Sequence, residues 1–295
     1  MKSYTIAGLA LSFLPFLTVN GQSSYDPPTN QGFEQAIQTL QMQPIRWYCF
    51  GTGAGSTITN LTQLAALFNP YGVAAQTVIH QEWERYQPFN AQNFVFTPNS
   101  LNLTATIPAG GGLFNGGINS SQIWSKETFK PGLNGKQVYG FLARAKIPNG
   151  QGSWPGIWWY SPNGQDGDGS EIDTLEFGIM KWQNQYDWSG FNHGPGVGSD
   201  IYSIKSNPWT WHPGIDFSAD YHNYEMIWTP DATYKYFDSQ LVYAQHFTWT
   251  ARGAAQFGAN LAVGSDQADL PGLQPTSLGQ FPESLSIQYI TIWAK

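Results

Sequence analysis

Short runs of strand-forming residues, separated by Gly, Pro and Asn, fill the chain from His80 onward and most constrain its fold. Each run has the length of a strand and not of a helix. Turn-forming combinations such as Pro148-Asn-Gly150 separate them. The pattern predicts an all-β antiparallel sandwich in a single domain spanning 32–295. The expected strands are 94–97, 101–107, 122–129, 138–147, 156–161, 171–177, 186–193, 201–204, 222–228, 233–237, 241–247, 257–263 and 285–293.

The N-terminal part differs in character from this β-rich region. Met1-Lys2 precedes an apolar run from Ile6 to Val19, which is interrupted by Pro15 and ends in small or tolerated residues. This pattern predicts a secretory signal peptide at 1–21, followed by a flexible leader at 22–31. The spacing of Phe33, Ile37 and Leu40 then predicts a short helix within 32–43. Residues 32–79 form an atypical N-terminal extension of the domain.

The amino-acid composition limits the kinds of molecule that the chain is expected to bind. The net charge of −7 argues against nucleic acid and anionic membranes as partners. Cys49 is the single cysteine, so the chain forms no internal disulfide. The 13 Trp exceed what a core needs, which favours flat platforms for sugar rings beside an aromatic core. We expect a secreted, extracellular monomer, and the sequons at Asn60, Asn102 and Asn119 fit a glycoprotein.

Residues 170–178 read SEIDTLEFG and place three acids in one apolar strand. Strand side chains alternate between faces, so Glu171 and Asp173 share a face and Glu176 falls on the other. A β-bulge at Thr174-Leu175 shifts the phase by one residue and returns Glu176 to the face of the first two acids. Two alternatives are a solvated surface strand and a calcium loop formed with Asp166 and Asp168.

Three carboxyls on one face repel each other, and this raises at least one pKa. Glycosidic bond cleavage uses such an arrangement, because it needs one ionised carboxylate and one protonated carboxyl. In retaining enzymes these two groups lie about 5–5.5 Å apart. This chemistry needs no cofactor and no metal.

Several ordered motifs resemble those of glycoside hydrolase family 16. Glu171–Glu176 (EIDTLE) resembles the active-site signature of the family in the form with one additional residue. The resemblance extends over about 80–295, through Gly152–Trp158 (GSWPGIW), Tyr221–Pro230 (YHNYEMIWTP), Phe257–Gly264 (FGANLAVG) and Ser286–Trp293. It implies a β-jelly-roll sandwich, similar to concanavalin A, with a concave sugar-binding cleft.

The resemblance also implies roles for the acids. By position, Glu171 is the nucleophile, Glu176 the acid/base and Asp173 the assisting acid. One departure is Ile227, which stands where the family usually has Glu. A second is the block Asp166-Gly-Asp-Gly169, which lengthens the approach to the acid motif.

Four residues are candidates for substrate binding. Trp154 and Trp158 are an even number of residues apart and share a face, whereas Trp159 points to the core or the outer side. Trp124 is a further platform candidate. His193 follows the acid strand, where similar enzymes often carry a cleft histidine, although a structural role is an equal alternative. His222 is assigned a structural role.

These observations predict a secreted retaining endo-glucanase acting on β-1,3 or mixed β-1,3/1,4 glucan. Two alternatives are other activities of the same family: a cell-wall transglycosylase and a galactan hydrolase. A third alternative is a non-catalytic carbohydrate-binding sandwich.

Overall fold

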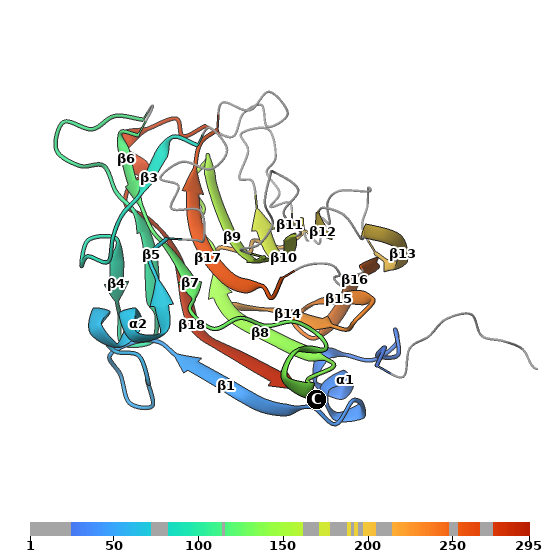
Figure 1. Cartoon of the computed structure of the whole chain (residues 1–295). Helices are drawn as coiled ribbons and strands as arrows, with labels where there is room; N and C mark the ends of the chain where they lie inside the picture. The colour runs from blue at the N-terminus through green and yellow to red at the C-terminus, as the bar shows by residue number, and fades with distance from the viewer. Residues whose placement is uncertain are drawn as a thin grey trace, which may run out of the picture.

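Two antiparallel sheets lie face to face in the computed structural model (Figure 1). It describes residues 25–71, 82–113, 116–161, 171–177, 188–189, 192–193, 197–204, 214–247, 253–265 and 274–295. The predicted β-sandwich is therefore confirmed. The expected signal peptide lies outside the described residues and stays a prediction. No helix within the described ranges is long and apolar enough to cross a lipid bilayer.

The larger sheet, as described, has nine strands. In spatial order these are β13 (Val197–Ser203), β16 (Gln240–Phe247), β15 (Ala232–Phe237), β14 (His222–Trp228), β8 (Tyr139–Lys146), β18 (Glu283–Ala294), β5 (Leu101–Ala105) and β4 (Phe94–Phe96), with β1 (Gln43–Cys49) also paired to β18.

The smaller sheet has seven described strands. Their order is β11 (Trp188–Ser189), β10 (Glu171–Phe177), β9 (Ser153–Tyr160), β17 (Gln256–Val263), β7 (Gln122–Ser125) and β2 (Phe68–Asn69), with β12 (Asn192–His193) also paired to β10. A separate parallel pair joins β3 (Glu84–Tyr86) to β6 (Ile118–Ser120). The helical elements are α1 (Phe33–Thr39), α2 (Leu61–Leu67) and two 3₁₀ turns at Leu133–Gly135 and Leu278–Gln280.

The space between the sheets is filled by an aromatic core. Trp159 of β9 is fully buried there and meets Trp228 of β14 across the layers, with ring centroids 5.8 Å apart. Phe257 and Phe141 pack against the same indole. Trp159 therefore occupies the core, as alternation along β9 predicts.

Strand β1 was not among the predicted strands. Its sequence, QPIRWYC, contains Pro44 and Arg46, which weaken the strand signal. Pro is tolerated in edge strands, and β1 pairs only with β18 at the side of the larger sheet. The short strands β2, β3 and β6 were also not predicted, because two or three residues are too few to show an alternation of apolar and polar side chains.

A second apolar cluster lies on the outer face of the larger sheet, beneath helix α1. Phe33 and Ile37 of α1 and the following Leu40 are buried there, which confirms the predicted helix and its apolar stripe. They pack against outer-facing side chains of the sheet that include Ile227. This covering accounts for the departure at Ile227, because an ionised Glu at that position would be buried among apolar groups. Residues 25–31 of the predicted leader belong to the same region, where Tyr25 packs against the cluster.

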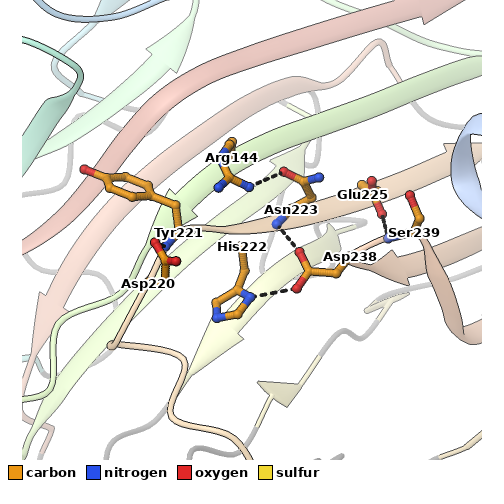
Figure 2. A network of polar contacts seen from close by, with 8 residues as sticks. All are labelled: Arg144, Asp220, Tyr221, His222, Asn223, Glu225, Asp238 and Ser239. Atoms are coloured by element: carbon orange, nitrogen blue, oxygen red, sulfur yellow. Dashed lines mark hydrogen bonds and ion pairs between the residues drawn. The ribbon is translucent and has the colours of Figure 1, made fainter.

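The turn between β15 and β16 connects this region to the sheet. Asp238 and Ser239 both have positive φ, 44° and 67°, as a two-residue hairpin turn requires. One Asp238 oxygen accepts the Asn223 backbone N–H at 2.8 Å, and the other lies 2.7 Å from Nδ1 of His222. Figure 2 shows these contacts. His222 thus stabilises a turn, in line with its structural assignment.

Glu225 is a buried carboxyl beside the same turn. Its Oε2 accepts the Ser239 backbone N–H at 2.8 Å (Figure 2). The Ser239 carbonyl accepts the backbone N–H of Phe33 in α1. Burial, with smaller contributions from the carboxylates of Asp238 and Glu34, raises the pKa of Glu225 to about 8, while the hydrogen bond from the Ser239 backbone acts in the opposite direction. Glu225 is therefore protonated at neutral pH in the folded protein.

Replacing Ile227 by Glu tests whether α1 covers the outer face. The variant loses a packed apolar side chain and buries a carboxyl among apolar groups, so the free energy of unfolding falls by roughly 3–5 kcal/mol. Urea unfolding followed by circular dichroism measures this change. Val197→Glu, on an exposed position of the same sheet, is the control and stays within about 0.5 kcal/mol of the parent. An unchanged midpoint in Ile227→Glu contradicts the covering.

Glu225 makes stability depend on pH. Its folded pKa of about 8 lies above the ordinary value of 4.5, so the folded chain keeps a proton that the unfolded chain releases. The stabilisation is complete below pH 4.5 and is lost as the pH rises through 8. Glu225→Gln removes this dependence, so its advantage over the parent grows by about 1.4 kcal/mol per pH unit across that window.

Urea midpoints at several pH values measure the difference, and Glu127→Gln, on an exposed carboxyl paired with Arg46, is the control. A difference between Glu225→Gln and the parent that does not change with pH excludes an ionising Glu225.

Candidate active site

The acid strand β10 carries the predicted irregularity. Asp173 pairs with Trp158 of β9, but the next pair joins Leu175 to Ile157, so the register shifts by one residue. Thr174 is the extra residue in β10. The β-bulge expected at Thr174-Leu175 is thus confirmed.

The bulge places two consecutive side chains on the core side. The Thr174 hydroxyl lies 4.0 Å from the sulfur of Met226 in the opposite sheet, and Leu175 belongs to the core. The remaining core-facing members of β10 are Ile172 and Phe177. Glu171, Asp173 and Glu176 are left on the other face. The acids therefore gather on the side of the smaller sheet that faces away from the core.

The carboxyls of Glu171 and Asp173 interact directly. Burial raises the pKa of Glu171 well above its usual range, and the negative charges of Asp173 and Glu176 raise it further. A hydrogen bond joins the Glu171 and Asp173 side chains. The cation of Lys235, which is fully buried on β15, acts in the opposite direction and lowers the pKa of Glu171.

Glu176 is held by an indole from the neighbouring strand. Trp154 Nε1 donates a hydrogen bond to Glu176 Oε1 at 3.0 Å. Gly156 is the backbone partner of Glu176, and a Cβ at Gly156 would lie 2.9 Å from Oδ1 of Asn260. The absence of a side chain there leaves room for Asn260 between β9 and β17.

Trp158 is fixed on the same face by a hydrogen-bonded chain. Its Nε1 donates to Asn260 Oδ1 at 2.8 Å, and Asn260 Nδ2 donates to the Tyr86 hydroxyl at 2.9 Å. Tyr160 packs its ring against Trp158 at 5.9 Å between centroids. Trp154 and Trp158 thus share the face of the acids, as their spacing predicts, while both remain partly exposed.

Trp124 of β7 lies beside Trp158 but is 2% exposed. The two rings meet edge to face with centroids 4.6 Å apart. A Cβ on Gly258 would come within 2.7 Å of the Trp124 ring, so the indole lies directly over that glycine. Trp124 therefore supports Trp158 from the side, and its own contact with a sugar stays a prediction.

The backbone of His193 pairs with that of Glu171. The side chain of His193 lies outside the described part of the structure, so its substrate contact stays a prediction. Its neighbour Asn192 donates from Nδ2 to Thr233 Oγ1 at 2.8 Å and to Gln245 Oε1 at 3.0 Å. These bonds tie the edge of the smaller sheet to the larger one beside the acid strand.

Three further residues belong to this site and were not predicted: Asn260, Tyr86 and Lys235. Asn260 lies in the stretch FGANLAVG, two residues after Gly258. This even spacing places both residues on the same face of the strand, which was the sequence signal that could have identified Asn260. Lys235 is a single cation between two tyrosines in a strand. The sequence alone suggests that it faces solvent, because its burial by the opposite sheet is visible only in the structure.

The residues that the structure describes hold no group of three His, Cys, Asp or Glu side chains able to bind a metal ion. Asp166 and Asp168, which the calcium alternative invoked, lie outside the described residues.

Comparison with known proteins gives a family and two relatives. The family described as glycosyl hydrolases family 16 matches residues 84–260. A glucan endo-1,3-beta-glucosidase from Cryptopygus antarcticus is 29% identical over 116 residues, covering 38% of this chain and 40% of the relative. A beta-glucanase from Rhodothermus marinus is 25% identical over 178 residues, covering 53% and 57%. The aligned parts thus span about two fifths to three fifths of these relatives.

Solved structures share the fold at low identity. The laminarinase catalytic domain from Thermotoga maritima has a TM-score of 0.60 at 21% identity, covering 86% of this chain and 98% of that one. The endo-beta-1,3-glucanase from Pyrococcus furiosus has a TM-score of 0.61 at 22% identity, covering 86% and 94%. The sandwich, the bulged acid strand and the match over 84–260 lead to one conclusion. The chain belongs to glycosyl hydrolase family 16.

Proposed function

We propose that the protein is a retaining glycoside hydrolase that cleaves internal β-1,3 or mixed β-1,3/1,4 linkages of glucan. The observation that carries this proposal is the bulge in β10, which leaves three carboxyls on one face beside two partly exposed indoles. The names of the relatives, a glucan endo-1,3-beta-glucosidase and a beta-glucanase, support the choice of substrate.

Glu171 is the proposed nucleophile. In the first step its carboxylate attacks the anomeric carbon, while Glu176 transfers its proton to the departing glycosidic oxygen. The glycosidic bond breaks and a covalent glycosyl-enzyme ester forms. In the second step Glu176 accepts a proton from water, the hydroxide attacks the same carbon, and Glu171 departs as a carboxylate. Two inversions give net retention.

Asp173 keeps Glu171 ready for attack. The hydrogen bond between the two side chains holds the Glu171 carboxyl in position for attack. The buried cation of Lys235 favours the ionised form of Glu171, because it lowers the pKa of Glu171 from behind the sheet.

Trp154 and Trp158 supply flat apolar surfaces for pyranose rings next to the acids. Trp154 also orients the proposed acid/base, because its N–H is bonded to Glu176. Trp158 cannot rotate freely, because its N–H is held by Asn260. A platform fixed before binding loses less conformational entropy when a sugar arrives.

Replacing the acids tests the assignment. Glu176→Gln cannot donate a proton, so kcat on glucan falls by roughly 10²- to 10⁴-fold. Glu171→Gln removes the nucleophile, so hydrolysis falls at least as far while glucan binding persists. Glu127→Gln, on an exposed surface carboxyl paired with Arg46, is the matched control and keeps full activity.

Reducing-sugar release on laminarin, lichenan and agar measures activity, and mass spectrometry of the products separates hydrolysis from transglycosylation. Unchanged activity in Glu171→Gln refutes the mechanism. Tight glucan binding without turnover by the parent protein identifies a binding module.

Asn260→Ala tests the platform. It leaves the Trp158 N–H without its acceptor, and a typical net hydrogen-bond contribution predicts a KM for glucan oligosaccharides that is roughly three- to tenfold higher. The value of kcat changes less, because the acids are untouched. Tyr86→Phe, which keeps the Asn260–Trp158 bond, is the comparison and raises KM less. Equal KM values in Asn260→Ala and the parent exclude this role.

A further inference from the structure

Trp47 is an exposed aromatic residue on the outer face of the larger sheet, on strand β1. Its exposed fraction, 57%, is the largest among the large apolar side chains that the structure describes. The indole lies parallel to the Tyr289 ring, with centroids 5.4 Å apart and planes at 10°. The indole is therefore stacked on the tyrosine ring, and this contact holds the exposed Trp47 side chain in place, away from the acid strand, which belongs to the other sheet.

Polar side chains continue this surface across the next two strands. Arg144 of β8 is the backbone partner of Tyr289. Its Nε donates to Gln288 Oε1 at 3.0 Å, and its Nη1 donates to Asn223 Oδ1 at 3.2 Å. Figure 2 shows the Arg144–Asn223 bond on the outer face of β14. The guanidinium thus fixes two side-chain amides by their oxygens.

Both amide nitrogens keep their donors available. Within the described residues, neither Gln288 nor Asn223 donates a side-chain hydrogen bond to another protein group, and both side chains are partly exposed. A planar amide with its oxygen anchored presents two N–H groups in a fixed direction. Such groups bind ligand hydroxyls without a large loss of side-chain entropy.

The dimensions favour an extended ligand. The surface crosses four neighbouring strands, β1, β18, β8 and β14, which at 4.7–4.9 Å per spacing amounts to roughly 15 Å. An aromatic pair at one end and fixed amides at the other match a chain of pyranose rings, whose faces are apolar and whose edges carry hydroxyls.

A protein partner fits this surface less well. Stable interfaces bury about 800 Å² per partner around an apolar centre. Outer-facing apolar side chains of this sheet that include Ile227 and Leu142 lie beneath α1. The neighbours of the aromatic pair are the polar side chains of Arg144, Gln288 and Asn223, which suit a sugar better than the apolar centre of a dimer interface.

We propose that Trp47, Tyr289, Arg144, Gln288 and Asn223 form a second glucan-binding surface, on the face opposite the acid strand. It binds the neutral polysaccharide and holds the enzyme on polymeric substrate. The identity of the glycan rests on the proposed function, whereas the site itself rests on the contacts of these five residues.

Trp47→Ala tests the proposal. Retention on insoluble β-1,3-glucan, measured by depletion from solution, weakens roughly three- to tenfold because the stacking surface is lost. Hydrolysis of insoluble glucan slows at low substrate, while kcat and KM on short soluble oligosaccharides stay unchanged. Arg144→Ala, which releases both amides, weakens retention in the same direction. Leu278→Ala removes a comparably exposed apolar side chain elsewhere and is the control.

Trp47→Ala that folds like the parent and is retained equally well overturns the proposal. An altered oligomeric state in light scattering, with unchanged retention, also overturns it and marks the face as a self-association surface. Failure of the parent protein to hydrolyse soluble glucan refutes the proposed function instead, and retention on the insoluble polymer still tests the surface independently.

Discussion

One additional residue in β10 is the constraint on which the acid site depends. Thr174 and Leu175 both point to the core, so the strand changes phase between Asp173 and Glu176. In a regular strand Glu176 would enter an apolar core, where an ionised carboxylate is costly. The bulge lets the sheet keep its packing on one side and collect its acids on the other.

The acid cluster also depends on the opposite sheet. Burial and the negative charges of Asp173 and Glu176 raise the pKa of Glu171, and Lys235 of β15 offsets part of this rise across the layers. Asn192 ties the edge strand β12 to Thr233, which is two residues before Lys235. The protonation state of Glu171, the proposed nucleophile, therefore depends on both sheets, and changes in sheet packing alter it without replacing any of the three acids.

The sequence was sufficient for features that follow a local period. Alternation located most strands, and counting residues from Glu171 located the bulge. It was insufficient where the partner comes from a distant strand. Asn260 is a neutral residue whose role arises from Trp158 and Tyr86, and Lys235 resembles a solvated cation until the second sheet covers it. The short extra strands and β1 lacked a clear period, and Pro44 weakened the signal of β1 further.

The outer face of the larger sheet is determined by the packing of helix α1, and not by an irregular strand as on the acid face. Helix α1 has seven residues, too few to be stable alone, so it persists only through the packing of Phe33 and Ile37 on the sheet. That packing made Ile the compatible residue at 227 and buried Glu225 in its protonated form. The helix covers part of the face, Tyr289 packs against the edge of the cluster beneath it, and Trp47 stays largely exposed. Covering by α1 thus sets the boundary of the exposed aromatic surface, and the N-terminal extension shapes a surface remote from the acids.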